Sequence, residues 1–459
     1  MQFVGRQREL SLIRERIDSD KSEAVLVYGR RRVGKSHLIM EALKDMKFPV
    51  IQYVCRKSSF QRNMEGLSRE AAKTFQEPFV RFETIDQLLE YAYGKASQQK
   101  VVLFIDEYPF LRGDDEAIDS EFQIAIDKWQ HRACLKIILC GSYVETMQKL
   151  VDSRAPLFGR FTEMLKLKPF DYYDVAKFFP GRSNEDKLLL YSVFGGVPFY
   201  LMQLDDRLSP AGNIKKLLIP EGSVLESEIR LQLTAELSKE ENANFVLEKI
   251  ASGVCKYSDI SRDFSGSSGR LSHTLGKLEG MGLIEKDSPM NASSNKRQHR
   301  YVICDNLLDF YYTFLFRETT ARSAMSPDDF FQAHVEEPLE NDYLPRKFEQ
   351  AAREYLLRQN RAGKINPPFS AIGRYVYHDK AKKQNGEFDV VTKDAKGLFS
   401  YECKYKKAPL GMKVVHKEEW KAKELGLDFY GFGFFSRSGF AEDVDASSYR
   451  LITLQDMYV

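Results

Sequence analysis

Lys35 and Ser36 close a glycine-framed loop that has the spacing of a phosphate-binding loop. Residues 25–43 read VLVYGRRRVGKSHLIMEAL, with four residues between Gly29 and Gly34. In such a loop, backbone N–H groups turn toward phosphate oxygens and the next helix offers its positive N-terminus. Lys35 is expected to reach the β and γ oxygens, and Ser36 to hold Mg²⁺. The predicted nucleotide-binding residues here are Gly29, Arg30, Arg31, Arg32, Val33, Gly34, Lys35, Ser36 and His37.

Two acidic residues end a later apolar run, VVLFIDE, and supply the second half of this chemistry. Asp106 is expected to bind Mg²⁺ directly or through water, and Glu107 to polarise an attacking water. A further apolar run, KIILCGS, ends in Ser142. Two interpretations of Ser142 stay open: it senses the γ-phosphate, or it caps the following helix.

Arg30, Arg31 and Arg32 fill the variable positions of the loop, whose backbone cradles the phosphates. One interpretation is that they add positive potential for nucleotide capture. The other is that they pair with acidic residues of a lid or of a neighbouring subunit.

The segments around the loop alternate short apolar runs with amphipathic stretches up to about residue 205. EAVLVYG, PVIQYVC, KVVLFIDE and LKIILCGS predict buried strands, each followed by a helical pattern. This order is typical of an α/β fold with a parallel sheet.

With these motifs, the chain resembles the prokaryotic AAA+-type ATPases of the archaeal-ATPase group, which are related to the STAND and origin-recognition ATPases. The resemblance implies ATP as cofactor, with Phe3 to Arg6, and so Val4, Gly5 and Arg6, near the adenine and Pro198 of the GGVP segment near the base. It also makes Arg160 a candidate arginine finger, which would require a homo-oligomer if it acts on a neighbouring subunit. The alternative for Arg160 is a solvated surface side chain.

A winged helix is predicted in the middle of the chain, where three short helical stretches precede a hairpin-like segment. Its third helix, about Ser268 to Met281, would face DNA, while a wing carrying Lys296, Arg297, His299 and Arg300 would touch phosphate. The alternative is a domain that serves only as a lid or a subunit contact.

The C-terminal stretch GEFDVVTKDAKGLFSYECKYKK predicts an antiparallel hairpin that brings acids and a lysine together. Asp389 and Glu402 offer oxygen ligands to Mg²⁺ or Mn²⁺, and Lys404 could position or activate water that attacks a phosphodiester. The arrangement resembles the PD-(D/E)xK nuclease fold, which adds Glu349 as the acid of the first helix. The alternative is a nuclease-like fold retained for structure or binding.

Composition limits the remaining classes. The 68 basic and 66 acidic residues nearly cancel, so any basic surface must be local. No apolar run suits a signal peptide or a membrane span, and a cytoplasmic protein is expected. The six cysteines lack metal-ligand spacing, and most of them are expected to be reduced, buried and structural.

The predicted fold is a parallel phosphate-loop sheet with a helical lid, a winged helix and a C-terminal restriction-endonuclease-like domain. The expected boundaries are 1–205 for the ATPase domain, 206–320 for lid and winged helix, and 321–459 for the nuclease-like domain. The functional hypothesis is an ATPase that regulates a metal-dependent nuclease acting on DNA. The alternative is a STAND-like switch, or a DNA-binding scaffold whose nuclease-like domain is inactive.

Overall fold

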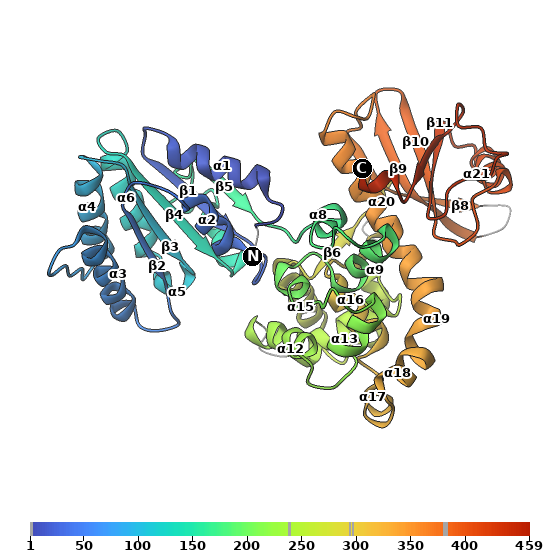
Figure 1. The fold of residues 1–459 in the computed structure, drawn as a ribbon, viewed down its shortest axis with the longest axis horizontal. Helices are drawn as coiled ribbons and strands as arrows, with labels where there is room; N and C mark the ends of the chain where they lie inside the picture. The colour runs from blue at the N-terminus through green and yellow to red at the C-terminus, as the bar shows by residue number, and fades with distance from the viewer. Residues whose placement is uncertain (1–2, 237–239, 293–294, 296–297, 380–383) are drawn as a thin grey trace. The chain divides into compact units, whose positions relative to one another are not determined.

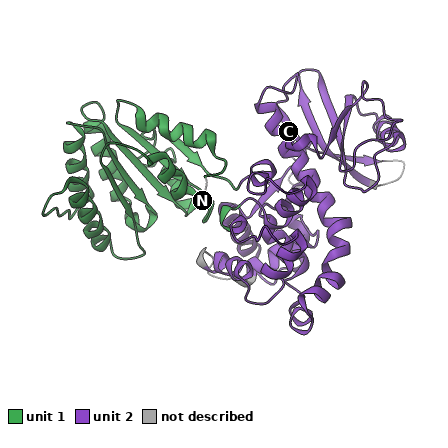
Figure 2. Ribbon diagram, in the orientation of Figure 1, with its two compact units in different colours: residues 1–169, 197–199 green, residues 170–196, 200–459 purple. Residues whose placement is uncertain are grey.

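The structure is a computed structural model that describes residues 3–236, 240–292, 295, 298–379 and 384–459. The chain forms two compact units (Figure 2). Unit 1 contains residues 1–169 and 197–199, and unit 2 contains residues 170–196 and 200–459. Of the predicted wing residues, Lys296 and Arg297 lie outside the described residues.

Unit 1 is built on a five-stranded sheet in the order β2-β3-β4-β1-β5, in which every neighbouring pair is parallel (Figure 1). Its strands are β1 (Glu23–Tyr28), β2 (Val50–Val54), β3 (Val101–Asp106), β4 (Leu135–Gly141) and β5 (Glu163–Lys166). The predicted α/β fold with a parallel sheet is confirmed.

Helices cover both faces of this sheet, so its central strands are apolar on both sides. On β1, Val25 and Val27 join the core beneath α1 and α2, whereas Ala24 and Leu26 join the core beneath α3, α4 and α6. The helices of this unit are α1 (Gln7–Asp18), α2 (Lys35–Leu43), α3 (Phe60–Phe75), α4 (Ile85–Ala96), α5 (Pro109–Arg112), α6 (Ala117–Trp129) and α7 (Val144–Lys149).

Unit 2 begins with helices and a small hairpin. Strands β6 (Ile284–Asp287) and β7 (Arg300–Ile303) pair antiparallel after three helices, the order expected for a winged helix. The helices up to residue 324 are α8 (Tyr172–Ala176), α9 (Asn184–Phe194), α10 (Pro198–Leu201, shared with unit 1), α11 (Pro210–Leu217), α12 (Val224–Glu236), α13 (Glu240–Ala251), α14 (Tyr257–Asp263), α15 (Ser268–Gly280), α16 (Asn306–Phe314) and α17 (Thr319–Ala324).

The proline- and acid-rich stretch after residue 325 is helical almost throughout. Pro338 has no N–H to donate, and two π-helical turns flank it. The run consists of α18 (Pro327–Phe330), η2 (Phe331–Val335), α19 (Glu336–Pro338), η3 (Leu339–Tyr343) and α20 (Leu344–Arg361).

The C-terminal part is a mixed sheet in the order β12-β11-β10-β9-β8. Phe434 of β11 packs with Val415 of α21, and Phe435, which faces the other way, packs on Phe348 of α20. The elements are β8 (Ala371–Asp379), β9 (Gln384–Asp394), β10 (Gly397–Lys404), α21 (Met412–Glu424), β11 (Phe429–Ser436), β12 (Arg450–Thr453) and the 3₁₀ turn η4 (Asp456–Tyr458).

The cysteines and the hydrophobicity of the helices bear on the redox state and on membrane insertion. All six cysteines are free thiols. Cys55, Cys140 and Cys403 are buried, whereas Cys134, Cys255 and Cys304 are half-buried, so the expectation that most of them are buried holds for only three. Within the described ranges, no helix combines the length and the apolar character that crossing a bilayer requires.

Candidate functional site

The phosphate loop joins β1 to α2 in a conformation that depends on glycine. Gly34 caps α2 with a φ of 90°, and Gly29 has a φ of 155°. A Cβ at Gly29 would collide with the carbonyl oxygen of Leu167. The loop therefore has the strand, loop and helix context that the sequence motif requires.

Lys35 is buried inside this loop with neutral partners. Its Nζ donates hydrogen bonds to the carbonyl oxygens of Gly29 (2.9 Å) and Arg30 (3.0 Å) and to Ser142 Oγ (2.8 Å). Burial lowers the pKa of Lys35, while the nearby acids Glu107 and Asp106 act in the opposite direction. A buried ammonium group held by neutral oxygens fits an anionic ligand, so these residues suit the phosphates of a nucleotide.

Glu107 and Ser142 bring the ends of β3 and β4 to the same place. Ser142 Oγ lies 2.7 Å from Glu107 Oε1, and the Ser142 N–H donates to Glu107 Oε2 at 3.3 Å. Asp106, buried at the end of β3, accepts a hydrogen bond from the Glu107 N–H at 2.9 Å. Tyr143, and not Ser142, is the N-cap of α7, so the capping interpretation of Ser142 does not hold.

Each of the three loop arginines has its own environment. Arg30 is buried, whereas Arg31 donates a hydrogen bond to Tyr143 Oη (2.7 Å) and lies over that ring. Arg32, with a φ of 66°, stacks on Phe199 at 3.8 Å from the ring centroid. Aromatic rings thus contact two of the three guanidinium groups.

The N-terminal segment lies against the loop. The Arg6 guanidinium donates to the carbonyl oxygens of Val33 (3.5 Å) and Lys168, and Phe3 stacks on exposed His37 of α2. Val4 and Gly5 immediately precede Arg6, and Gly5 has a φ of 69°. These contacts place the segment beside the loop; its predicted role at the adenine stays a prediction.

Three further predicted residues of unit 1 differ in their surroundings. Pro198 lies 3.7 Å from the position that a Cβ of Gly34 would occupy. Ser36 is exposed in the first turn of α2. Arg160 forms an ion pair with Asp127 of α6 (3.1 Å) and also donates to the Phe158 carbonyl oxygen. Its role as an arginine finger remains a prediction.

The predicted C-terminal site residues gather around a β-bulge. Gly373 pairs with Val391 and Tyr375 with Phe388, so Asp389 and its neighbour face a single residue of β8. The β9–β10 ladder ends at Val390 and Tyr401, and the next residues along the two strands are Asp389 and Glu402.

The acids of this cluster influence one another electrostatically. Burial, followed by the charge of Asp389, raises the pKa of Glu349 in α20 and that of Glu402. Lys404 forms an ion pair with Glu402. Sequence analysis missed Arg353, one helical turn after Glu349, whose Nη2 donates to the Asp389 carbonyl oxygen at 2.9 Å.

The cluster has the charge but not the geometry of a metal site. Within the part of the chain that the structure describes, no three His, Cys, Asp or Glu side chains come close enough to hold a metal ion. Glu402 is instead neutralised by Lys404. In this arrangement the residues do not fit a bound divalent cation.

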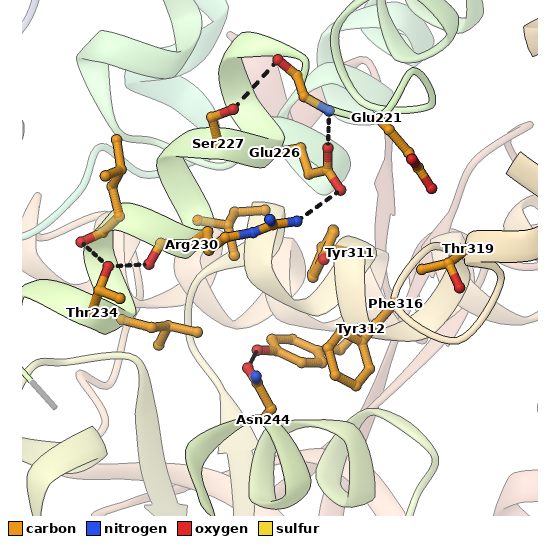
Figure 3. Close-up of a pocket in the computed structure, with 14 residues that line it drawn as sticks. Glu221, Glu226, Ser227, Arg230, Thr234, Asn244, Tyr311, Tyr312, Phe316 and Thr319 are labelled. Carbon is orange, nitrogen blue, oxygen red and sulfur yellow. Dashed lines mark hydrogen bonds and ion pairs between the residues drawn. The ribbon is translucent and has the colours of Figure 1, made fainter. Parts of the chain in front are cut away.

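A separate cavity of about 950 Å³ lies between α12, α13 and α16 (Figure 3). Tyr311, Tyr312 and Phe316 line one side, and Arg230 and Glu226 line the other. No residue predicted to be functional lies among its lining residues. The cavity is therefore distinct from both candidate sites.

The parallel sheet, the glycine loop and the acidic residues at the end of β3 define a phosphate-loop ATPase. Residues 3–204 match a family of ATPase domains predominantly from Archaea, and residues 311–422 match DUF234, a family of archaeal and bacterial proteins of unknown function. The chain belongs to the archaeal ATPases that carry a C-terminal DUF234 domain, as the sequence resemblance predicted.

The chain is similar to other proteins over different shares of its length. An uncharacterised protein of Methanocaldococcus jannaschii is 28% identical over 434 residues, which cover 93% of each chain. An uncharacterised ATP-binding protein of the same organism is 36% identical over 53 residues, 12% of this chain and 90% of that one. The Walker-type ATPase of Pyrococcus abyssi is similar in fold, with a TM-score of 0.51, 21% identity and coverage of 68% of this chain and 96% of that chain.

Proposed function

We propose that the protein binds and hydrolyses ATP with Mg²⁺ in unit 1 and thereby regulates its C-terminal domain. The observation that carries the ATPase proposal is a series of hydrogen bonds: Ser142 bonds both to Lys35, at the start of α2, and to Glu107, and Ser142 and Glu107 follow the neighbouring parallel strands β4 and β3. Lys35 would exchange its neutral partners for phosphate oxygens. Mg²⁺, held by Ser36 and Asp106, would neutralise phosphate charge. Glu107, which Ser142 holds in position, would accept a proton from the attacking water.

For the C-terminal domain we propose a nuclease-like, cation-dependent action on DNA. The support is the convergence of Glu349, Asp389 and Glu402 with Lys404 at a bulge, a feature frequent beside active sites. Because the carboxylates do not form a cation site in this arrangement, they would have to rearrange before acting. The exposed face of α15, with Ser268, Arg270 and His273, is proposed to contact DNA.

A second candidate function is supported by the same cluster. Lys404 and Glu402 pair with each other, so neither charge needs a metal ion or a substrate to balance it. Such an arrangement suits a domain that binds a partner without catalysing a reaction. The protein would then be an ATP-dependent switch or scaffold resembling STAND ATPases. The domain boundaries at 205 and 320, a homo-oligomer and a cytoplasmic location also remain proposals.

One assay separates these functions. Wild type, Lys35→Ala and Lys404→Ala are compared for ATP hydrolysis and for cleavage of supercoiled and linear DNA with Mg²⁺ or Mn²⁺, with and without ATP. We expect Lys35→Ala to lower hydrolysis by roughly a hundredfold or more, and Lys404→Ala to abolish cleavage while hydrolysis is unchanged. ATP binding without cleavage under any condition would favour the switch. Unchanged hydrolysis in Lys35→Ala would refute the ATPase proposal.

A further inference from the structure

Unit 1 continues into unit 2 through two connecting segments, residues 167–170 and 196–200, and the boundaries between the units fall within them. The Phe170 N–H donates a hydrogen bond to the Gly196 carbonyl oxygen at 2.8 Å. A Cβ at Gly196 would lie 1.8 Å from the Phe170 carbonyl oxygen, so only glycine permits this close approach. The two connecting segments are therefore bonded to each other.

The first connecting segment is fastened to the phosphate loop at two points. Gly29 of the loop lies so close to Leu167 that a Cβ at Gly29 would be 2.3 Å from the Leu167 carbonyl oxygen. The Arg6 guanidinium donates both to the carbonyl oxygen of Val33 in the loop (3.5 Å) and to that of Lys168 in the segment. A displacement of the loop would therefore be transmitted to this segment.

The second connecting segment is fastened to the same loop by Pro198 and Phe199. Pro198 lies 3.7 Å from the position that a Cβ of Gly34 would occupy. The guanidinium carbon of Arg32 lies 3.8 Å from the centroid of the Phe199 ring. Arg32 has a φ of 66°, a conformation that a residue other than glycine keeps only when its surroundings hold it. The ring of Phe199 is part of those surroundings.

Nucleotide binding would change the loop where the connecting segments are attached. Lys35 Nζ donates to the carbonyl oxygens of Gly29 and Arg30. Under the proposed function, these bonds are exchanged for bonds to phosphate oxygens, and Gly29 is also the residue that packs on Leu167. The loop with phosphate therefore differs from the loop without it next to the first connecting segment.

We propose that Arg32 is a positioning residue that holds the second connecting segment on the phosphate loop, so that a bound nucleotide makes the connecting segments open less often. Phosphate oxygens that bind the loop amides restrain the loop, and the restraint extends to the segments that the loop holds. This inference rests on the proposed binding of ATP in unit 1. It names the contact through which that binding would act on the start of unit 2.

Hydrogen exchange of the Phe170 amide tests the inference, because this amide donates the bond that joins the two connecting segments. Exchange in the full chain is followed by mass spectrometry of a peptide that contains Phe170, with and without Mg²⁺ and a non-hydrolysable ATP analogue. The analogue is used at saturation, which isothermal titration calorimetry establishes for each protein. In wild type, the analogue is expected to slow the exchange by roughly tenfold.

In Arg32→Gln this slowing should become smaller by about two- to fivefold, because the contact between the cation and the ring is lost. Phe199→Leu keeps an apolar side chain without the ring and should have the same effect, and the double variant should lose no more than either single variant. Arg31→Gln is the matched control. It removes the same charge from the same loop, but Arg31 contacts Tyr143, which is outside the connecting segments, so the full slowing should remain.

The possible results separate this inference from the proposed function. If wild type binds the analogue and exchange at Phe170 is unchanged, or if Arg32→Gln keeps the full slowing, the role of Arg32 is wrong and the proposed ATP binding stands. An equal loss of slowing in Arg31→Gln would assign the effect to the charge of the loop and would also overturn the inference. If wild type binds no analogue, the proposed function fails, and the inference fails with it.

Discussion

At the residue scale, Ser142 connects the two charged groups on which hydrolysis is proposed to depend. Its hydroxyl lies 2.8 Å from Lys35 Nζ and 2.7 Å from Glu107 Oε1. Glu107 has a φ of 50°, a conformation that a non-glycine residue keeps only when its surroundings hold it. The hydroxyl of Ser142 is part of those surroundings, so Ser142 is a positioning residue.

Replacing Ser142 by alanine should therefore impair turnover more than binding. We expect Ser142→Ala to lower kcat for ATP hydrolysis by roughly tenfold or more while KM changes less than about threefold, because Glu107 loses its orientation. Ser142→Thr keeps the hydroxyl and should retain most activity. Steady-state kinetics on the three proteins tests this, and a raised KM with unchanged kcat would assign Ser142 to nucleotide binding instead.

Residues of the candidate sites were predictable where they belong to one short stretch of sequence with a recognisable motif. Gly29, Lys35 and Ser36 lie within one short motif, and Asp106 ends a continuous apolar run. Arg300 and Arg374 meet Glu387 from separate segments, and no spacing in the sequence indicates this. Arg353 was within reach of prediction, since it follows Glu349 by one helical turn.

At the element scale, a buried carboxyl group joins three parts of unit 2. Glu354 of α20 accepts hydrogen bonds from the Tyr191 hydroxyl of α9 (2.6 Å) and from the Tyr172 N–H (3.2 Å). Burial is the main cause that raises the pKa of Glu354 to about 7. The titratable and charged groups facing it are Asp171, Tyr172, Tyr191, Tyr458 and, through Asp171, Arg358.

This carboxyl group should make unit 2 less stable at higher pH. From about pH 4.5 to 7 the folded state keeps a proton that the unfolded state, with an ordinary glutamate pKa, has released. The contribution of Glu354 to the unfolding free energy is thus fully present below that range and decreases by up to roughly 3 kcal/mol as the pH rises through 7. Glu354→Gln should remove this decrease.

The two tryptophans, Trp129 in unit 1 and Trp420 in unit 2, allow the measurement. In a Trp129→Phe background, Trp420 fluorescence reports urea unfolding of unit 2 at pH 5 and pH 8. Glu337→Gln, which changes an exposed acid of α19, is the matched control. An equal pH dependence with glutamate or glutamine at position 354 would show that Glu354 ionises freely in the folded state.

Helices and strands were predictable from the sequence where the pattern of apolar residues had the usual length for such an element. The four long strands of unit 1 appeared as apolar runs, but β5 has four residues with only Leu165 buried and no such run. The helical run from residue 327 to 361 contains prolines, which usually end a helix, and two π-helical turns flank Pro338, so no regular helical pattern marks it in the sequence. The bulge at Asp389 interrupts the two-residue alternation of side chains along β9, which the sequence does not indicate.

At the scale of the whole molecule, a variant of Arg160 can show whether one subunit contributes to the ATP site of its neighbour. Its guanidinium forms an ion pair with Asp127, and about a third of the side chain is exposed. If Arg160 completes a neighbouring site, Arg160→Ala should lower ATP hydrolysis by roughly a hundredfold or more, since it removes charge that stabilises the transition state. Mixing Arg160→Ala with Lys35→Ala should then restore part of the activity.

The mixture is informative because neither variant is expected to hydrolyse ATP alone. In a mixed assembly, the Arg160→Ala subunit has an intact Lys35, and a neighbouring Lys35→Ala subunit can supply an intact Arg160 to that site. Hydrolysis by each protein and by the mixture is measured at equal total concentration. Arg160→Ala with wild-type activity would leave Arg160 as a surface residue, and inactivity of the mixture would show that Arg160 acts within its own chain.

The helices α8 and α9 lie inside the ATPase family segment, which ends at residue 204, yet they belong to unit 2. Both helices are hydrogen-bonded to later parts of the chain: Tyr172 Oη donates to the Met457 carbonyl oxygen (2.8 Å), and the Ser192 backbone carbonyl oxygen accepts from Tyr343 Oη (3.1 Å). A gene fragment cut at the family border would therefore leave unit 1 complete but remove α8 and α9 from the core of unit 2. Recombination that separates the two family segments would require compensating changes in both fragments. We therefore expect the two segments to be inherited together.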